Sequence, residues 1–205
     1  MRTKTDSRKQ AILAAAAEVF KETGFERSSM AEICARVGYS KATLYSYFAS
    51  KEELFIETIA LAAEESFQAT LQALNTNKKD IKQALESFGR TSLAFLYSPQ
   101  MQTARRLVVA ESGRSDLGQR CYDIGPLRSG LEIGKFLQNA IDAGKLRSAN
   151  TQIAALHLRA LLEAEWIDHF MCNTHEPSTK EIADSVKRAV EVFMAAYGPL
   201  QKVQD

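Results

Sequence analysis

Residues 37–55, VGYSKATLYSYFASKEELF, concentrate hydroxyl, phenol and ammonium groups in one short stretch. Proteins use these donors against phosphate oxygens and the edges of nucleic-acid bases. Leu44 and Phe48 lie one helical turn apart in the same stretch, so a helix here would bury one narrow apolar face. The other positions would then present their donors to solvent, which suits noncovalent binding of a phosphate-bearing partner.

Two short helices are expected to position these donors. Ser29 and Glu32 have the spacing of a capping box, which predicts a helix that runs to Gly38. Ser40 can cap the next helix, after a tight turn at residues 38–40. The pattern predicts a helix-turn-helix, in which the second helix can lie in the major groove of DNA while the first braces it.

The second helix should turn its polar side chains outward if Leu44 and Phe48 face a preceding helix. Lys41 and Lys51 each follow a capping serine, which places a positive charge at the positive end of a helix dipole at a cost of about 0.3–1 kcal/mol. A bound phosphate would reverse the sign of that cost. Tyr45 falls at the border of the two faces. The outward donors are Ser40, Lys41, Thr43, Ser46 and Tyr47.

A plain structural αα-hairpin is the alternative, because capped helix pairs are common. Tyr39 and Tyr45 would then serve mainly as packing residues. The charge distribution favours the nucleic-acid interpretation. Residues 1–50 carry eight Lys and Arg against five Asp and Glu, whereas the remainder carries 18 against 20.

Composition limits the class of protein. The chain has 205 residues, of which 45% are hydrophobic and 25% charged, so it can bury a sizeable core in one large or two small domains. No apolar run approaches the roughly 18 residues of a membrane span, and residues 1–10 lack the apolar core of a signal peptide. Cys34, Cys121 and Cys172 are far apart and odd in number, which favours reduced thiols. We expect a cytoplasmic protein without a cofactor.

Helical signals continue along the chain and predict an all-α fold of nine or ten helices. A long helix should run from Ser50 to about Leu74, and residues 98–99 and 125–126 each resemble a cap followed by proline at a helix start. Ser178 should open the final helix. The expected architecture is a three-helix DNA-binding domain at residues 1–53 and a helical bundle for ligand binding and dimerisation at residues 54–205.

The stretch GYSKATLYSYFASKEELF, preceded by GFERSSMAEICARV, resembles the DNA-binding region of TetR-family transcriptional regulators. The resemblance covers residues 7 to about 61. It departs from the common pattern at Cys34, at Tyr39 where valine is frequent, and at Ala42 where glycine is common. The resemblance implies base contacts by Lys41 and Ala42. It implies phosphate contacts by Thr43, Tyr45, Tyr47 and Lys51, and by Ser28 or Ser29 at the start of the preceding helix.

The segment RRLVVAESGRSDLGQRCYDIGPLRSGLEIGKFLQNAIDAGKLR resembles the C-terminal domain of AefR-like TetR regulators. This implies a regulatory domain with a small-molecule cavity and dimerisation through the last two long helices. A stripe at helical spacing is the candidate dimer surface, although the same pattern also suits an intrachain core. The stripe consists of Ile153, Leu156, Ala160, Ala164 and Ile167.

Effector contacts are expected from large apolar side chains of the second half, where ordinary core packing is the alternative. A metal-binding protein or enzyme is the competing class, because Glu165, His169 and Cys172 share one helix face. The chain has no Gly-rich phosphate loop, nucleophile elbow or paired zinc motif, so we expect no enzyme. The candidate pocket residues are Phe67, Phe88, Phe95, Tyr97, Trp166, Phe170 and Met171.

The favoured hypothesis is a homodimeric repressor that leaves a near-palindromic operator when a small, largely apolar effector binds.

Overall fold

The computed structural model describes residues 4–75, 80–111, 113 and 116–199. These residues contain eleven α-helices and one π-helical turn, and no strand. The all-α fold is therefore confirmed, although nine or ten helices were expected. None of the described helices is both long and apolar enough to cross a membrane.

The chain divides into two compact units. Unit 1 comprises residues 1–65 and 99–121, and unit 2 comprises residues 66–98 and 122–205. Helix α4 (Lys51–Asn75) begins in unit 1 and ends in unit 2. The functional boundary predicted between residues 53 and 54 stays a prediction, since α4 runs through it without interruption.

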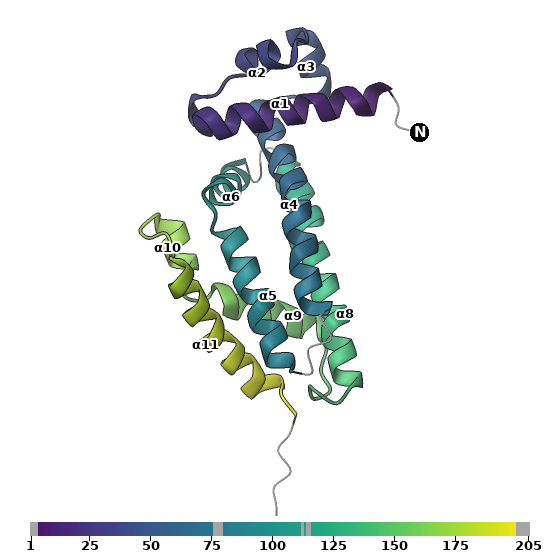
Figure 1. Cartoon of the computed structure of the whole chain (residues 1–205), viewed down its shortest axis with the longest axis vertical. Coiled ribbons are helices and arrows are strands. Elements are labelled where there is room, and N and C mark those ends of the chain that lie inside the picture. Colours follow the sequence, from purple (N-terminus) through teal and green to yellow (C-terminus); the bar gives the residue numbers. More distant parts are fainter. Residues whose placement is uncertain (1–3, 76–79, 112, 114–115, 200–205) are drawn as a thin grey trace, which may run out of the picture. The chain divides into compact units, whose positions relative to one another are not determined.

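In unit 1, α2 and α3 lie on the same side of α1 (Figure 1). The aromatic rings of Phe20, Phe25 and Phe55 form the centre of its core, with two centroid separations of 4.9 Å. Leu44 and Phe48 are fully buried in the same core, as their spacing predicted. Besides the first part of α4, the helices of unit 1 are α1 (Lys4–Arg27), α2 (Met30–Val37), α3 (Lys41–Tyr47), α6 (Pro99–Glu111) and α7 (Leu117–Tyr122).

Local signals set the bounds of the short helices. Ser29 accepts a hydrogen bond from the Glu32 amide at the start of α2, and Ser40 does the same for the Thr43 amide at the start of α3. Gly38 adopts a left-handed conformation with φ of 74°, and its amide bonds the Cys34 carbonyl to close α2. The predicted helix-turn-helix is therefore present.

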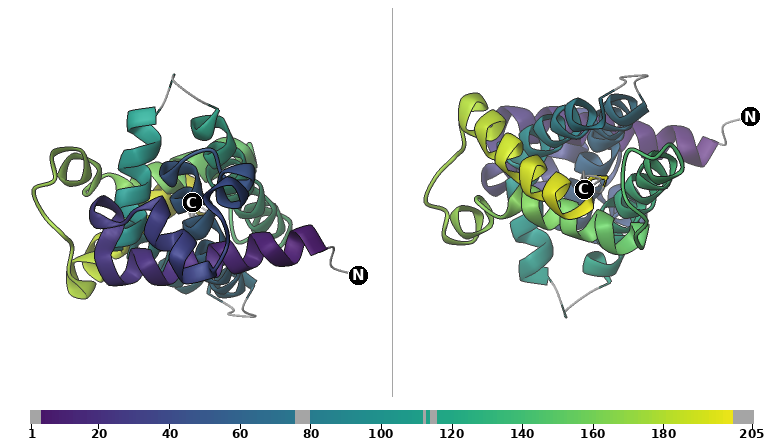
Figure 2. Two further views of the ribbon diagram at one scale, coloured as in Figure 1. Left: turned by 90° about the horizontal axis from the view of Figure 1, so that it is seen from above. Right: turned by 90° about the horizontal axis from the view of Figure 1, so that it is seen from below.

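Unit 2 is a bundle in which α11 packs beside α5 and α9, and α9 packs beside α8 (Figure 2). A Cβ added at Gly89 would lie 2.7 Å from the Leu162 side chain and 2.8 Å from that of Val186, so glycine allows α5 this close approach. The helices of unit 2 are α5 (Ile81–Leu96), α8 (Arg128–Asp142), α9 (Thr151–Glu163), α10 (Ile167–Cys172) and α11 (Thr179–Tyr197), with a π-helical turn η1 (Asp123–Leu127).

Two expected helix starts have different outcomes. Pro99 does open α6, whereas Pro126 lies inside η1, between α7 and α8, so the helix start predicted there is wrong. Proline removes a backbone donor and crowds the preceding turn of a regular α-helix. A π-helical turn widens the helix locally, which lets the chain pass Pro126 without a break.

Candidate nucleic-acid interface

Helix α3 separates packing from polar side chains. Leu44 faces the core, while Lys41, Ala42, Tyr45 and Ser46 are exposed, Tyr45 by 43%. Helix α3 is only seven residues long, so tertiary packing must hold it in place. Complete burial of one Leu side chain contributes about 1.5–3 kcal/mol, which is enough to anchor a short helix on the unit 1 core.

Hydroxyl groups at the start of α3 are linked to one another and to the backbone. Ser40 Oγ accepts from the Thr43 amide at 3.1 Å and lies 2.8 Å from Thr43 Oγ1. Ser46 Oγ donates to the Thr43 carbonyl at 2.7 Å. One hydroxyl of the Ser40–Thr43 pair donates to the other, so the second can direct its proton toward solvent.

Lys41 and Tyr45 form an exposed cation–π pair. The Lys41 Nζ lies 5.7 Å from the centroid of the Tyr45 ring, one turn along α3. This contact is worth about 0.5–1 kcal/mol at an exposed site and limits the rotamers of both side chains. A positive charge is thus held on the outward face of α3, where a base edge or phosphate could meet it.

The two serines before α2 have different environments. Ser29 is exposed and serves as the N-cap of α2. Ser28 is only 5% exposed, and its hydroxyl donates to the Phe25 carbonyl at 2.7 Å. Of the two alternatives implied by the family resemblance, Ser29 is the one whose hydroxyl is accessible.

Lys51 is directed toward the protein. Its Nζ donates to the carbonyls of Phe25 at 2.8 Å and Ser28 at 3.2 Å, and lies 4.2 Å from the Phe25 ring centroid. The ammonium group thus joins the start of α4 to the turn between α1 and α2. Sequence reasoning missed this role because the partners lie 26 and 23 residues earlier in the chain.

An ion pair between α1 and α2 also escaped the sequence analysis. The Arg36 guanidinium binds both carboxylate oxygens of Glu22, at 3.0 and 2.7 Å, and lies 3.5 Å from Glu18. The hydrogen bond to Arg36 lowers the pKa of Glu22, and the bond to Glu22 raises the pKa of Arg36. This fork braces α2, the helix that supports α3.

The competing metal site is not assembled. Glu165 binds the Arg188 guanidinium through both oxygens, at 2.9 and 2.6 Å, and this bond lowers the pKa of Glu165. His169 Nδ1 lies 2.8 Å from the Thr174 hydroxyl, and Cys172 is exposed. No group of three His, Cys, Asp or Glu side chains in the described part of the chain is placed to hold a metal ion.

The predicted effector residues lie in different environments. Phe88, Tyr97, Trp166 and Phe170 belong to the buried core of unit 2, whereas Met171 is 66% exposed. Phe67 and Phe95 are half-buried, and the Arg128 guanidinium lies 4.3 Å from the Phe67 ring centroid. Trp166 also borders a pocket of about 280 Å³, whose other lining residues are Glu165, His169, His175, Glu181, Asp184 and Arg188.

Every residue of the predicted dimer stripe is exposed on the single chain. Ile153, Leu156 and Ile167 are 47%, 54% and 38% exposed, and Ala160 and Ala164 are exposed as well. The opposite face of α9 supplies the intrachain core through Ala154, Ala155, Leu158 and Leu162. The intrachain alternative for the stripe is therefore wrong.

Sequence profiles of known families match both parts of the chain. Residues 12–58 match the bacterial regulatory proteins of the tetR family, and residues 83–199 match the C-terminal domain of AefR-like transcriptional repressors.

Two relatives match over shorter segments. The HTH-type transcriptional activator FasR of Mycolicibacterium smegmatis is 36% identical over 40% of this chain and 39% of its own. The HTH-type transcriptional regulator UidR of Escherichia coli K12 is 43% identical over 32% of this chain and 33% of its own. The chain thus spans well under half the length of these two relatives.

Two solved structures are similar over nearly the whole length. A Mesorhizobium loti protein assigned to the TetR family of transcriptional regulators is 26% identical, covers 96% of this chain and all of its own, and superposes with a TM-score of 0.82. The flavonoid-responsive regulator FrrA is 27% identical over 95% of this chain and 99% of its own, with a TM-score of 0.67. The relatives are transcriptional regulators and not enzymes. The helix-turn-helix, the two family matches and these structures show that the chain belongs to the TetR family of DNA-binding transcriptional regulators and carries an AefR-like C-terminal domain.

Proposed function

We propose that the protein is a homodimeric repressor that holds a near-palindromic operator through α3 and leaves it when a small, largely apolar effector binds. The observation that carries the proposal is the outward face of α3, where Lys41, Ala42 and Tyr45 are exposed beside a hydroxyl-rich helix start. A short helix with this face suits the major groove of B-DNA.

The proposed contacts divide into two sets. Lys41 and Ala42 meet base edges and so decide which sequence is bound, while the second set fixes the protein on the phosphates. Ser28 and Lys51, which the family resemblance would also assign to phosphates, are instead proposed to support the turn before α2, because both are bonded to its carbonyls. The phosphate set is Ser29, Ser40, Thr43, Tyr45 and Tyr47.

Dimerisation is proposed through α9 and α11. The exposed apolar stripe runs along α9 to the start of α10 and offers a surface to a partner chain, and α11 adds Val192, which is 53% exposed. The alanines of the stripe allow a partner helix to approach closely. A two-fold dimer presents two copies of α3, so its operator should contain two inverted half-sites about one helical turn, or a multiple of it, apart.

The sign of regulation is proposed to be repression. The C-terminal profile is that of AefR-like transcriptional repressors, which supports this sign, whereas FasR is named an activator. A bound dimer represses when its site overlaps the promoter. The position of the selected site relative to the transcription start therefore tests the sign separately from DNA binding.

Effector release is proposed to act through α4 and the segment before η1. Residues 99–121 lie within the match to the C-terminal domain, yet Ala104 and Leu117 are buried in the core of unit 1. A ligand that shifts these elements would disturb the packing beneath the helix-turn-helix. A ligand with an about 100-fold preference for the DNA-incompetent state would lower operator affinity by up to that factor, or about 2.7 kcal/mol.

The proposed lining consists of the seven predicted effector residues, with the half-buried Phe67 and Phe95 as the first contacts. FrrA, a structural relative, is named flavonoid-responsive, which supports a small organic effector. The four core members, Phe88, Tyr97, Trp166 and Phe170, would have to move to admit a ligand, as happens when a minor open state is selected.

Selection of bound fragments from genomic DNA by the purified protein tests this function. We expect enrichment of one inverted repeat near a promoter, and sequences without inverted symmetry would contradict the dimeric model. Apolar compounds that raise the melting temperature should then weaken binding to that repeat. Compounds that stabilise the protein but leave operator affinity unchanged at saturation would overturn the coupling.

A further inference from the structure

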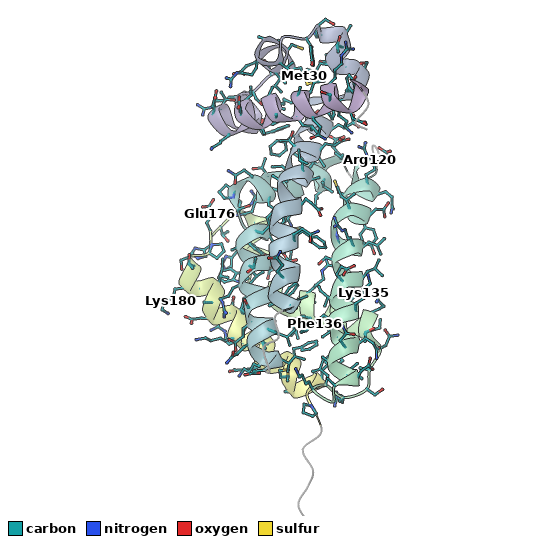
Figure 3. All side chains as sticks on the ribbon, turned by 45° about the vertical axis from the view of Figure 1, so that its right-hand side comes forward. Met30, Arg120, Lys135, Phe136, Glu176 and Lys180 are labelled. Carbon is teal, nitrogen blue, oxygen red and sulfur yellow. The ribbon has the colours of Figure 1, made fainter. Side chains whose placement is uncertain are left out.

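Arg120 on α7 binds two carboxylates of α4 in unit 1. Its Nη1 donates to Glu53 Oε1 and its Nη2 donates to Glu57 Oε1, both at 2.7 Å. The two acceptors lie one turn apart on α4, so a single guanidinium spans the first two turns of that helix. Figure 3 labels Arg120. A fork of this kind fixes orientation as well as distance, because both bonds share one planar group.

Glu53 connects this fork to the end of α3. Its second oxygen, Oε2, accepts from the Ala49 amide at 2.7 Å, and its own amide donates to Ser50 Oγ at 3.1 Å. Ala49 directly follows Phe48, the C-cap residue of α3. The side chain of Glu53 thus holds the junction between α3 and α4, and Arg120 holds the side chain of Glu53.

Glu57 extends the same network to α1. The ammonium of Lys9 lies 2.6 Å from Glu57 Oε2, while the other oxygen accepts from Arg120. Both carboxylate side chains are about one-fifth exposed, so solvent screens these pairs less than ordinary surface pairs. Glu53 and Glu57 thereby link α1, α4, α7 and the end of α3.

Glu53 and Arg120 both stay charged at neutral pH. Burial alone would raise the pKa of Glu53, but the hydrogen bonds from Arg120 and the Ala49 amide outweigh it and lower that pKa. The hydrogen bond to Glu53 raises the pKa of Arg120.

The backbone that carries Arg120 is itself anchored in unit 1. Leu117 on α7 is buried in the unit 1 core, and Cys121 packs against that core. Burial raises the pKa of the Cys121 thiol, which keeps it neutral and suited to this packing. Arg120 therefore extends from a fixed helix toward α4.

We propose that Arg120 is a positioning residue for operator binding: it fixes the α3–α4 junction, and with it the angle of α3, without touching DNA. The proposal rests on α3 as the operator-reading helix. It assigns part of the DNA-binding function to a residue beyond residues 12–58, in the segment that matches the AefR-like C-terminal domain.

The test compares Arg120→Gln with Arg120→Lys on the full chain, by measuring affinity for the selected operator and for random DNA over a range of salt concentrations. Arg120→Gln removes both bonds, and we expect operator affinity to fall about tenfold, the effect of losing roughly one charge-assisted pair. Random-DNA affinity should fall less, since a tilted α3 can still meet phosphates. The slope of log affinity against log salt concentration (the salt slope) should stay unchanged, because Arg120 contacts no phosphate in this proposal. Arg120→Lys can keep one carboxylate and should recover part of the loss.

Arg90→Gln is the matched control, because within the described part of the chain Arg90 pairs with Glu86, one turn away on its own helix in unit 2, at 3.6 Å. It removes the same charge and should leave operator affinity unchanged. In a double-mutant cycle, the effects of Arg120→Gln and Glu53→Gln on operator affinity should be strongly non-additive, because both substitutions break the same bond between Arg120 and Glu53. If Arg120→Gln fails to fold by circular dichroism, Glu57→Gln serves in its place, since it removes one arm of the fork.

Three results would overturn the proposal: unchanged operator affinity in Arg120→Gln, a salt slope reduced by about one phosphate contact, or an equal loss on operator and random DNA. Unchanged operator affinity would mean that Arg120 has no role in DNA binding. A reduced salt slope would mean that Arg120 contacts a phosphate directly. An equal loss on operator and random DNA would mean that the substitution destabilises the protein in general. Failure of the wild-type protein to select any DNA would instead count against α3 as the reading helix, and is seen before the variants are made.

Discussion

Helix α3 of unit 1 and helix α9 of unit 2 expose different kinds of side chain. The outward face of α3 in unit 1 carries Lys41, Tyr45 and Ser46, whereas the outward face of α9 in unit 2 carries Ile153 and Leu156. A polar face rich in donors can meet a polyanion without desolvating many apolar atoms. An apolar stripe gains most from another apolar surface. One molecule thus displays one surface suited to DNA and another suited to a second protein chain.

The polar groups of the two units also differ in how they are used. The Lys41 side chain is exposed on the outward face of α3 and makes no ion pair among the described residues. Around α10 and α11, in contrast, charged groups are paired with one another: Glu165 with Arg188, and Asp184 with Lys180. We expect substitutions of exposed α3 side chains to change DNA recognition. Substitutions of the paired charges around α10 and α11 should change only the stability of the protein.

The largest expected effect comes from placing charge on the apolar stripe. Ala160→Glu should prevent dimerisation and reduce operator affinity by at least about 100-fold, because a buried unpaired carboxylate costs several kcal/mol and a single head binds only one half-site. Sedimentation and operator titration would measure both. Ala94→Glu is the matched control, since Ala94 is an exposed alanine of α5. A fully dimeric Ala160→Glu protein with wild-type affinity would show that the stripe is not the dimer surface.

A smaller effect is expected from the exposed face of α3. Lys41→Ala should lower affinity for the selected operator by about 1–3 kcal/mol and change the preferred bases, because groove-facing residues carry sequence information. Lys21→Ala on α1 is the control, since Lys21 is an exposed lysine of the same unit. Repeating the fragment selection with both variants would show the change. An equal loss on every sequence would mean that Lys41 meets phosphate only.

Lys51 is a charged group of unit 1 whose ammonium is bonded within the protein, as the paired charged groups of unit 2 are. Lys51→Ala leaves the Phe25 and Ser28 carbonyls without a charged donor, so the free energy of unfolding should fall by about 1–3 kcal/mol. The salt slope of DNA binding should not change. If the slope of log affinity against log salt concentration falls by about 0.9, Lys51 must leave the two carbonyls and bind a phosphate when the protein binds DNA.

Sequence predicted the features that depend on near neighbours. The caps at Ser29, Ser40 and Ser178 lie within three residues of their partners, so the spacing of residue types was enough to place three helix starts. Arg120 and Lys51 have partners 23 to 67 residues away, which no local pattern reveals. The apolar stripe along α9 and the start of α10 was only partly predictable. Its helical period was clear from the sequence, but which side of the helix faces outward depends on how the whole bundle packs.

The proposed pocket was the hardest feature to predict, because core and cavity use the same residues. Phe88 and Phe170 are aromatic and apolar, as a ligand site requires, yet both are almost fully buried against their neighbours. Composition cannot distinguish these two environments. The distinction depends on how completely surrounding helices fill the space, which is a property of packing.

The smallest expected effect concerns the start of α11, where Glu181 closes a capping box. Its carboxylate accepts from the Ser178 hydroxyl at 2.6 Å and the Ser178 amide at 2.8 Å, and His175 Nε2 lies 3.1 Å away. The hydrogen bonds from Ser178, with a further contribution from His175, lower the pKa of Glu181 from 4.5 to about 2. A lowered pKa in the folded state means that the carboxylate stabilises the protein above pH 4.5 and that this contribution is lost as the pH falls toward 2.

Glu181→Gln should therefore make the protein less stable than the wild type at pH 7, with the difference shrinking below pH 4.5 and vanishing only below about pH 2. Thermal unfolding across this pH range would measure it. Glu176→Gln is the control, because Glu176 is a neighbouring exposed glutamate before the Ser178 cap (Figure 3). Neither change should alter operator affinity at neutral pH, since these polar groups act inside unit 2. A loss of operator affinity in Glu181→Gln alone, with the fold intact, would contradict this expectation, because it would mean that a paired polar group of unit 2 affects DNA binding by unit 1.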